Sequence, residues 1–172
     1  IAPLAPTARW CQTRSMPPAT AIDLALDANR RYGAAFTPGD TGQPALAVVL
    51  CMDARIDPIR ALGLRYGHAN IIRNAGGRVA DALRSLAISQ RRLGTREVAI
   101  IHHTECGMMT FTDDEIRSEL RRDTGMNFDH LAFLPFRDLE ESVRDDLRLY
   151  RMSPLVRHDI PVRGFVYDVA TG

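Results

Sequence analysis

The chain has 172 residues, of which 45% are hydrophobic and 25% are charged, and its formal net charge is +1. These values are typical of one soluble globular domain, and the net charge gives no electrostatic indication of nucleic acid or an anionic membrane as a partner. All 22 basic residues are arginine, which excludes chemistry that needs a lysine, such as a Schiff base. No apolar stretch reaches the roughly 20 residues that a membrane span requires.

The N-terminal segment is rich in proline and lacks the continuous apolar region of a secretory signal. We therefore predict a poorly ordered lead over residues 1–19 and a folded domain over 20–172. The three cysteines, at positions 11, 51 and 106, are an odd number without a disulfide framework, which favours the cytoplasm. Cys11 lies in the lead and is not expected to be a metal ligand.

The first predicted element is a helix over residues 21–36, with small apolar residues at helical spacing and Thr20 as its N-cap. Glycine and proline break the chain over 37–44. The run "ALAVVL" (45–50) is short and continuously apolar, as in a strand buried on both faces. A short helix is expected after Asp57, with a proline in its first turn.

The middle of the chain continues the alternation. Residues 69–77, "ANIIRNAGG", predict a second strand that runs into glycines, and residues 97–103, "EVAIIHH", predict a third. Between them, a helix is predicted over 79–94 that ends at a glycine. Its predicted apolar face consists of Val79, Leu83, Leu86 and Leu93.

Two further helices and a last strand complete the pattern. A helix over 112–125 has acids at its start and arginines near its end, as the helix dipole favours. A helix over 136–150 has an apolar stripe opposite charged residues, and residues 162–169 predict the final strand. The stripe consists of Leu139, Val143, Leu147 and Tyr150. The alternation predicts an α/β fold: a mainly parallel central β-sheet flanked by helices, in a single domain with an N-terminal helical extension.

Chemically active residues follow two of these strands. Cys51 and His103 each stand at the carboxyl end of a predicted strand, the edge at which open α/β sheets bind ligands. Considered alone, Cys51 is compatible with a buried core residue, a nucleophile, half of a redox pair or a metal ligand. A redox Cys-x-x-Cys motif is absent, because position 54 is alanine.

A second cysteine lies three residues after His103, in "HHTECGM" (102–108). His103 and Cys106 can both reach one ion across a tight turn, and Cys51 would complete a Cys2His set. Three protein ligands with one open position are typical of catalytic zinc, and thiolates with an imidazole favour zinc over magnesium or calcium. The pattern therefore predicts a zinc site.

The motifs "CMDAR", "IIRNAGG", "SLAISQRRLGTREV", "HHTECGM" and "GFVYDVATG" resemble, in this order and spacing, the β-class carbonic anhydrases, especially their short bacterial and archaeal-type members. The resemblance covers roughly residues 45–170. It implies that Cys51, His103 and Cys106 bind Zn2+ and that Asp53 and Arg55 form the family's catalytic Asp–Arg dyad.

The resemblance also implies the reaction, which is reversible hydration of carbon dioxide to bicarbonate and a proton through a zinc-bound hydroxide. Asp53 would either orient the hydroxide or bind zinc itself in a closed state, and Arg55 would hold that carboxylate away from the metal. The segment "NAGG", that is Asn74, Ala75, Gly76 and Gly77, would line the substrate cleft. His102 falls outside the ligand spacing and should point away from the metal as a structural histidine.

The family resemblance further implies a homodimer or higher homo-oligomer, with a small-molecule substrate and no nucleic-acid or membrane partner. Two alternatives remain open at this point. The same zinc scaffold could hydrolyse CS2 or COS. The chain could also be a non-catalytic zinc-binding regulatory protein, although a purely structural site has no need of Arg55.

Overall fold

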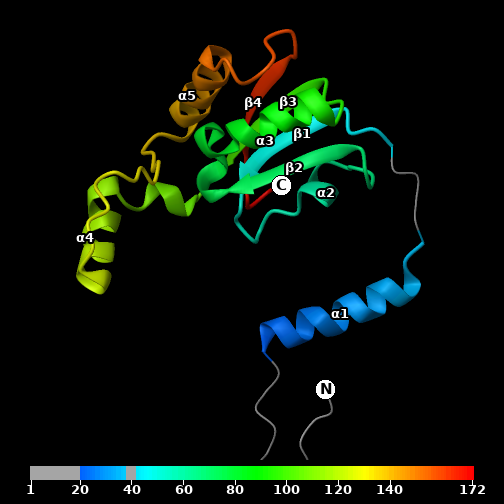
Figure 1. Cartoon of the computed structure of the whole chain (residues 1–172), viewed down its shortest axis with the longest axis horizontal. Coiled ribbons are helices and arrows are strands. Elements are labelled where there is room, and N and C mark those ends of the chain that lie inside the picture. Colours follow the sequence, from blue (N-terminus) through cyan, green and yellow to red (C-terminus); the bar gives the residue numbers. More distant parts are fainter. Residues whose placement is uncertain (1–19, 38–41) are drawn as a thin grey trace, which may run out of the picture. The chain divides into compact units, whose positions relative to one another are not determined.

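The computed structural model describes residues 20–37 and 42–172 (Figure 1). The chain divides into two compact units, residues 1–38 and 39–172, and each is described here by itself. The lead predicted over residues 1–19, with Cys11, lies outside the described residues. Within the described residues, no helix has the length and apolar character needed to cross a membrane.

The described part of the first unit contains one helix, α1 (Ala21–Ala35), as the sequence predicts. Thr20 is its N-cap. The Thr20 hydroxyl accepts a hydrogen bond from the Asp23 backbone N–H, and the Asp23 carboxylate accepts one from the Thr20 backbone N–H. This reciprocal pair satisfies donors that a helix start otherwise leaves unpaired. None of the α1 residues is buried.

A four-stranded parallel sheet forms the centre of the second unit, in the order β2-β1-β3-β4. Its strands are β1 (Leu46–Cys51), β2 (Ala69–Asn74), β3 (Glu97–His103) and β4 (Val162–Tyr167). Residues 47–51 of β1 are all buried, because the strand has neighbours on both edges and packing on both faces. This explains its uninterrupted apolar run and confirms the predicted sheet.

Two long helices, α3 (Val79–Arg92) and α5 (Leu139–Met152), pack against each other and against the sheet (Figure 1). The main core lies beneath them and includes Ala47, Val49, Val79, Leu86, Ile100 and Tyr150. Shorter elements complete the unit. They are α2 (Pro58–Ala61), α4 (Asp113–Thr124) and the single-turn 3-10 helices η1 (Ala75–Gly77) and η2 (Gly107–Met109).

The structure corrects several details of the sequence prediction, including the bounds of the last helix, Leu139–Met152, and of the last strand, Val162–Tyr167. The second strand ends at Asn74, because the following glycines turn into η1. Leu93, predicted to lie on the apolar face of α3, is 46% exposed because it is the C-cap, beyond the last turn. The inward face of α5 is partly polar, since Ser142 and Asp146 are buried beside Val143.

Candidate metal centre

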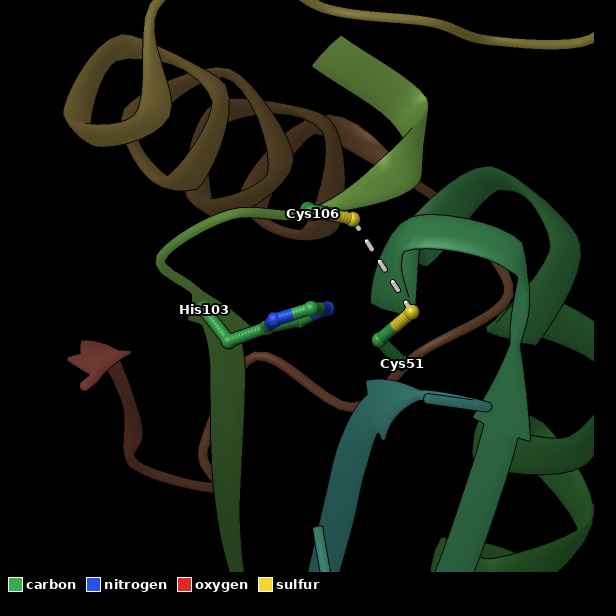
Figure 2. A group of neighbouring side chains, drawn as sticks. All are labelled: Cys51, His103 and Cys106. Carbon is green, nitrogen blue, oxygen red and sulfur yellow. Dashed lines mark hydrogen bonds between the residues drawn. The ribbon is translucent and has the colours of Figure 1, made fainter. Parts of the chain in front are cut away.

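The carboxyl ends of β1 and β3 bring together three potential metal ligands. Cys51 is the last residue of β1, His103 is the last of β3, and Cys106 follows in the turn before η2 (Figure 2). One ligand atom from each lies within 4.8 Å of those of the other two, and all three residues are buried. The parallel sheet therefore assembles the set that the sequence spacing predicts.

The donor atoms fit a zinc ion. His103 Nδ1 donates a hydrogen bond to the Thr104 carbonyl oxygen at 2.9 Å, which leaves the Nε2 lone pair free. Nε2 is buried and has no hydrogen-bond partner within residues 20–37 and 42–172. The two sulfur atoms lie 3.9 Å apart. Two Zn–S bonds of about 2.3 Å at a tetrahedral angle would separate the sulfurs by about 3.8 Å.

The two thiols do not ionise alike. The Cys106 thiol, 3.9 Å from Cys51 Sγ, lowers the pKa of Cys51, and the Gly76 backbone N–H strengthens this effect by donating to Cys51 Sγ at 3.3 Å. The same sulfur contact, together with burial, raises the pKa of Cys106. The Cys106 contact and the Gly76 N–H therefore favour the thiolate form of Cys51 over that of Cys106. Thiolate is the form that binds metal.

The predicted "NAGG" segment forms the turn next to Cys51. Gly76 and Gly77 have φ values of +76° and +70°, which disfavour any residue with a Cβ. A Cβ on Gly77 would also lie 2.9 Å from the Cys51 backbone nitrogen and 3.0 Å from the Ile101 carbonyl oxygen. Ala75 packs against the same buried cluster as the cysteines, and Asn74 Nδ2 donates to the Arg78 carbonyl oxygen at 2.8 Å.

Asp53 and Arg55, the predicted catalytic pair, are joined by hydrogen bonds close to Cys51 and His103. Arg55 donates to both carboxylate oxygens of Asp53, from Nε to Oδ1 at 3.1 Å and from Nη2 to Oδ2 at 2.8 Å. These bonds hold the pKa of Asp53 well below its usual range and raise that of Arg55. Asp53 Oδ2 lies 3.9 Å from His103 Nε2, so the carboxylate lies close to the three candidate ligand atoms.

Two partners of this pair were not predicted from the sequence. Glu105 accepts hydrogen bonds from Arg55 through its carboxylate at 2.8 Å and through its carbonyl oxygen at 3.1 Å. Glu105 has a φ of 55°, in the left-handed region that a non-glycine residue rarely adopts. Arg73 donates to the carbonyl oxygens of Cys51 at 2.9 Å and Asp53 at 2.5 Å. Glu105 lies in the motif "HHTECGM" and Arg73 in "IIRNAGG", and this position in the motifs was the one feature of the sequence that pointed to them.

His102 points away from the cluster, as strand alternation predicts. Its Nδ1 lies 2.7 Å from Ser142 Oγ and its Nε2 lies 3.0 Å from Asp146 Oδ2, both on α5. Both ring nitrogens therefore have protein partners, and the residue is fully buried. His102 therefore offers no free nitrogen to a metal, in contrast to the neighbouring His103.

The sequence model described as carbonic anhydrase matches residues 46–133. Beta-carbonic anhydrase 1 of Mycobacterium bovis is 49% identical over 130 residues, which cover 74% of this chain and 78% of that protein. The crystal structure of carbonic anhydrase from Streptococcus mutans superposes with a TM-score of 0.82 at 43% identity, covering 89% of this chain and 95% of that one.

More distant similarity extends to proteins named for a different substrate. Carbon disulfide hydrolase of Acidithiobacillus thiooxidans is 31% identical over 172 residues, covering 88% of this chain and 86% of that protein. The identity to this hydrolase is lower than that to the mycobacterial protein. The comparison therefore favours the carbonic anhydrases.

Proposed function

This chain belongs to the β-carbonic anhydrases, and we propose that it catalyses the reversible hydration of carbon dioxide to bicarbonate and a proton with Zn2+. The proposed zinc ligands are Cys51, His103 and Cys106. The observation that carries the proposal is the buried His103 Nε2, which has no hydrogen-bond partner among the described residues and faces two cysteine sulfurs. This donor set suits zinc and offers only three ligands, as catalytic sites do.

When bound, zinc supplies a Lewis acid that brings the pKa of water towards neutrality, so that a nucleophile forms at ordinary pH. The Asp53 carboxylate orients that nucleophile. Its lowered pKa keeps it ionised, so it acts only as a hydrogen-bond acceptor towards the attacking oxygen. Attack on CO2 and release of bicarbonate leave one proton, which completes the balance CO2 + H2O ⇌ HCO3⁻ + H⁺.

Arg55 determines which task Asp53 performs. Its bidentate hydrogen bonds aim the carboxylate at the free side of the cluster without releasing it to the metal. If those bonds are lost, Asp53 can become a fourth ligand and close the site. Asn74, Ala75, Gly76 and Gly77 are proposed to line the substrate cleft. Supporting this, the turn packs on Cys51, and its Gly76 backbone N–H donates to the Cys51 sulfur at 3.3 Å.

Stopped-flow measurement of CO2 hydration by the zinc-loaded protein tests the proposal. We expect turnover that is abolished by a chelator and restored by zinc. The same preparation assayed with CS2 tests the rival suggested by the 31% identical hydrolase. Faster turnover of CS2 than of CO2 would reassign the substrate, and no turnover of either would favour a non-catalytic zinc protein.

We also propose that the chain works as a homodimer or higher homo-oligomer in the cytoplasm. Apolar side chains of α1, among them Ile22, Leu24 and Leu26, are exposed. In the second unit, an apolar groove remains on the sheet, lined by Leu46, Leu62, Ala99, Ile101, Phe165 and Val166. A second copy would bury such surfaces, and a reducing compartment would keep the thiols of Cys51 and Cys106 available to metal.

Light scattering should therefore give a mass of at least twice the 19.1 kDa of one chain. The Arg55–Asp53 contact lies within one chain, so the measured mass does not depend on the proposed role of Arg55 in holding the Asp53 carboxylate. A stable, fully active monomer would contradict the oligomer.

A further inference from the structure

A buried polar cluster lies between β3 and α5, and the proposed mechanism does not use it. His102, Asp146 and Ser142 are 0%, 1% and 2% exposed. Burial of such groups costs free energy unless each is well paired, so an apolar core would be the simpler solution at this position. The partners of the three residues show what the cluster connects.

On one side, the cluster holds the end of β3. Asp146 Oδ2 lies 3.0 Å from His102 Nε2, and Ser142 Oγ lies 2.7 Å from His102 Nδ1. The Phe136 ring stacks on the imidazole, with centroids 5.4 Å apart and planes inclined by 22°. The imidazole is therefore fixed on three sides. Because His102 directly precedes His103, these contacts also fix the backbone that carries a proposed zinc ligand.

On the other side, the same carboxylate holds the glycine turn. Asp146 Oδ2 accepts a hydrogen bond from the Val79 backbone N–H at 3.1 Å, and Oδ1 lies 3.3 Å from Arg78 Nη2. Arg78 and Val79 directly follow the turn whose Gly76 N–H donates to Cys51 Sγ. Asn74 closes the turn from its other end by donating to the Arg78 carbonyl oxygen.

We propose that Asp146 is a positioning residue for the metal centre, which sets the spacing between Cys51 on β1 and His103 on β3 through these two sets of contacts. Asp146 touches neither metal nor substrate. It acts through His102 on one half of the site and through Arg78 and Val79 on the other. The inference rests on the zinc site proposed above.

Asp146→Asn is the discriminating variant, because it preserves shape but cannot satisfy both sides. With its oxygen at the Oδ2 position, the new NH2 group faces the Arg78 guanidinium. With the amide flipped, the NH2 group faces the Val79 N–H. Either orientation places donor against donor and releases one contact of the glycine turn.

Tyr150→Phe is the matched control. Tyr150 lies on the same helix, is 1% exposed, and accepts a hydrogen bond from Gln90 of α3 at 2.6 Å. Its loss removes a buried polar contact between α3 and α5 without touching either strand end. A merely structural role for Asp146 would make the two variants alike.

The experiment titrates metal-free full-length protein with zinc in competition with a chromophoric chelator. Absorption spectra of the cobalt-substituted proteins are recorded in parallel. We expect Asp146→Asn to weaken zinc binding about 10- to 100-fold, the range found when partners that orient metal ligands are removed. Its cobalt spectrum should also shift, because the ligand spacing has changed. Tyr150→Phe should match wild type in both measurements.

Zinc affinity of Asp146→Asn within threefold of wild type, or an equal loss in Tyr150→Phe, would overturn the proposal. If Asp146→Asn does not fold, Ser142→Ala decides, because it removes the partner of His102 Nδ1 and, besides that, only a local hydrogen bond to the Leu139 carbonyl oxygen. We expect a weaker loss of zinc affinity in that variant, and unchanged affinity would overturn the proposal. Failure of the wild-type protein itself to bind zinc would instead refute the proposed function.

Discussion

Two arginine–carboxylate pairs support the proposed zinc site, Asp53–Arg55 and Asp146–Arg78, and they differ in their exposure to solvent. The Asp53 and Arg55 side chains are 17% and 46% exposed, whereas those of Asp146 and Arg78 are 1% and 12% exposed. An exposed pair exchanges partners at little cost, whereas breaking a buried pair leaves an uncompensated charge. The Asp53–Arg55 pair is therefore suited to rearrange, and we call it the gate. The Asp146–Arg78 pair is suited to stay fixed, and we call it the frame.

The largest expected effect comes from the ligands that both pairs serve. Cys51→Ser, His103→Ala and Cys106→Ser should each lose zinc on gel filtration, since the ligand atoms that remain no longer form the three-donor set. Elemental analysis measures the metal content. Cys11→Ser is the control and should retain one zinc per chain. Full metal content in any of the three variants would remove that residue from the ligand set.

The next largest effect should separate frame from gate by stability. Asp146→Ala leaves Arg78 and the Val79 N–H buried without a partner, and we expect a loss of about 3–5 kcal/mol in the free energy of unfolding. Arg55→Ala removes an exposed partner and should leave the unfolding midpoint close to that of wild type. Urea titration of the two metal-free variants makes the comparison. Equal losses would show that exposure does not distinguish the pairs.

Arg55→Ala should instead show its effect in catalysis. The freed Asp53 carboxylate, 3.9 Å from His103 Nε2, would bind the metal and occupy the position that the reaction needs. We expect stopped-flow CO2 hydration to fall about 100-fold or more, a loss of the size that removal of a catalytic side chain typically causes, with zinc content unchanged. Asp53→Asn is the companion variant and should lower turnover while leaving the fourth position open. Near-normal turnover in Arg55→Ala would contradict the gate.

Glu105→Gln should have the smallest effect. Its carboxylate pairs with Arg55 but is 70% exposed, and the Glu105 carbonyl oxygen still accepts from the guanidinium after the substitution. We expect a slight fall in turnover and an unchanged unfolding midpoint in urea. A loss as large as that of Arg55→Ala would show that Glu105, and not Asp53, is the main anchor of Arg55.

Local sequence patterns predicted the strands of the sheet and the set of candidate metal ligands. Cys51 and His103 end largely apolar strands, and the carboxyl ends of parallel strands meet at one edge, so their convergence followed from the element order. The apolar stripe of α5 was also readable. The substrate cleft over Asn74–Gly77 and the oligomer stay predictions, because they were transferred from a family resemblance and nothing in a single chain tests them.

The buried frame was not predicted, because its contacts join distant parts of the chain. Val79 and Asp146 are 67 residues apart, and a carboxylate in a charged helix indicates solvent exposure unless its partner is known. One signal was present. Asp146 lies three residues after Val143 and four before Tyr150, so helical spacing places it on the inward face. Ser142 occupies the same face one turn earlier.

The central claim is that Cys51, His103 and Cys106 hold one zinc ion at the edge of the sheet. X-ray absorption at the zinc edge tests this most directly, on protein with one zinc per chain and on its Cys11→Ser variant. We expect two sulfur ligands and one imidazole nitrogen, identical in both proteins. Fewer than two sulfurs, or a change of ligands on loss of Cys11, would contradict it.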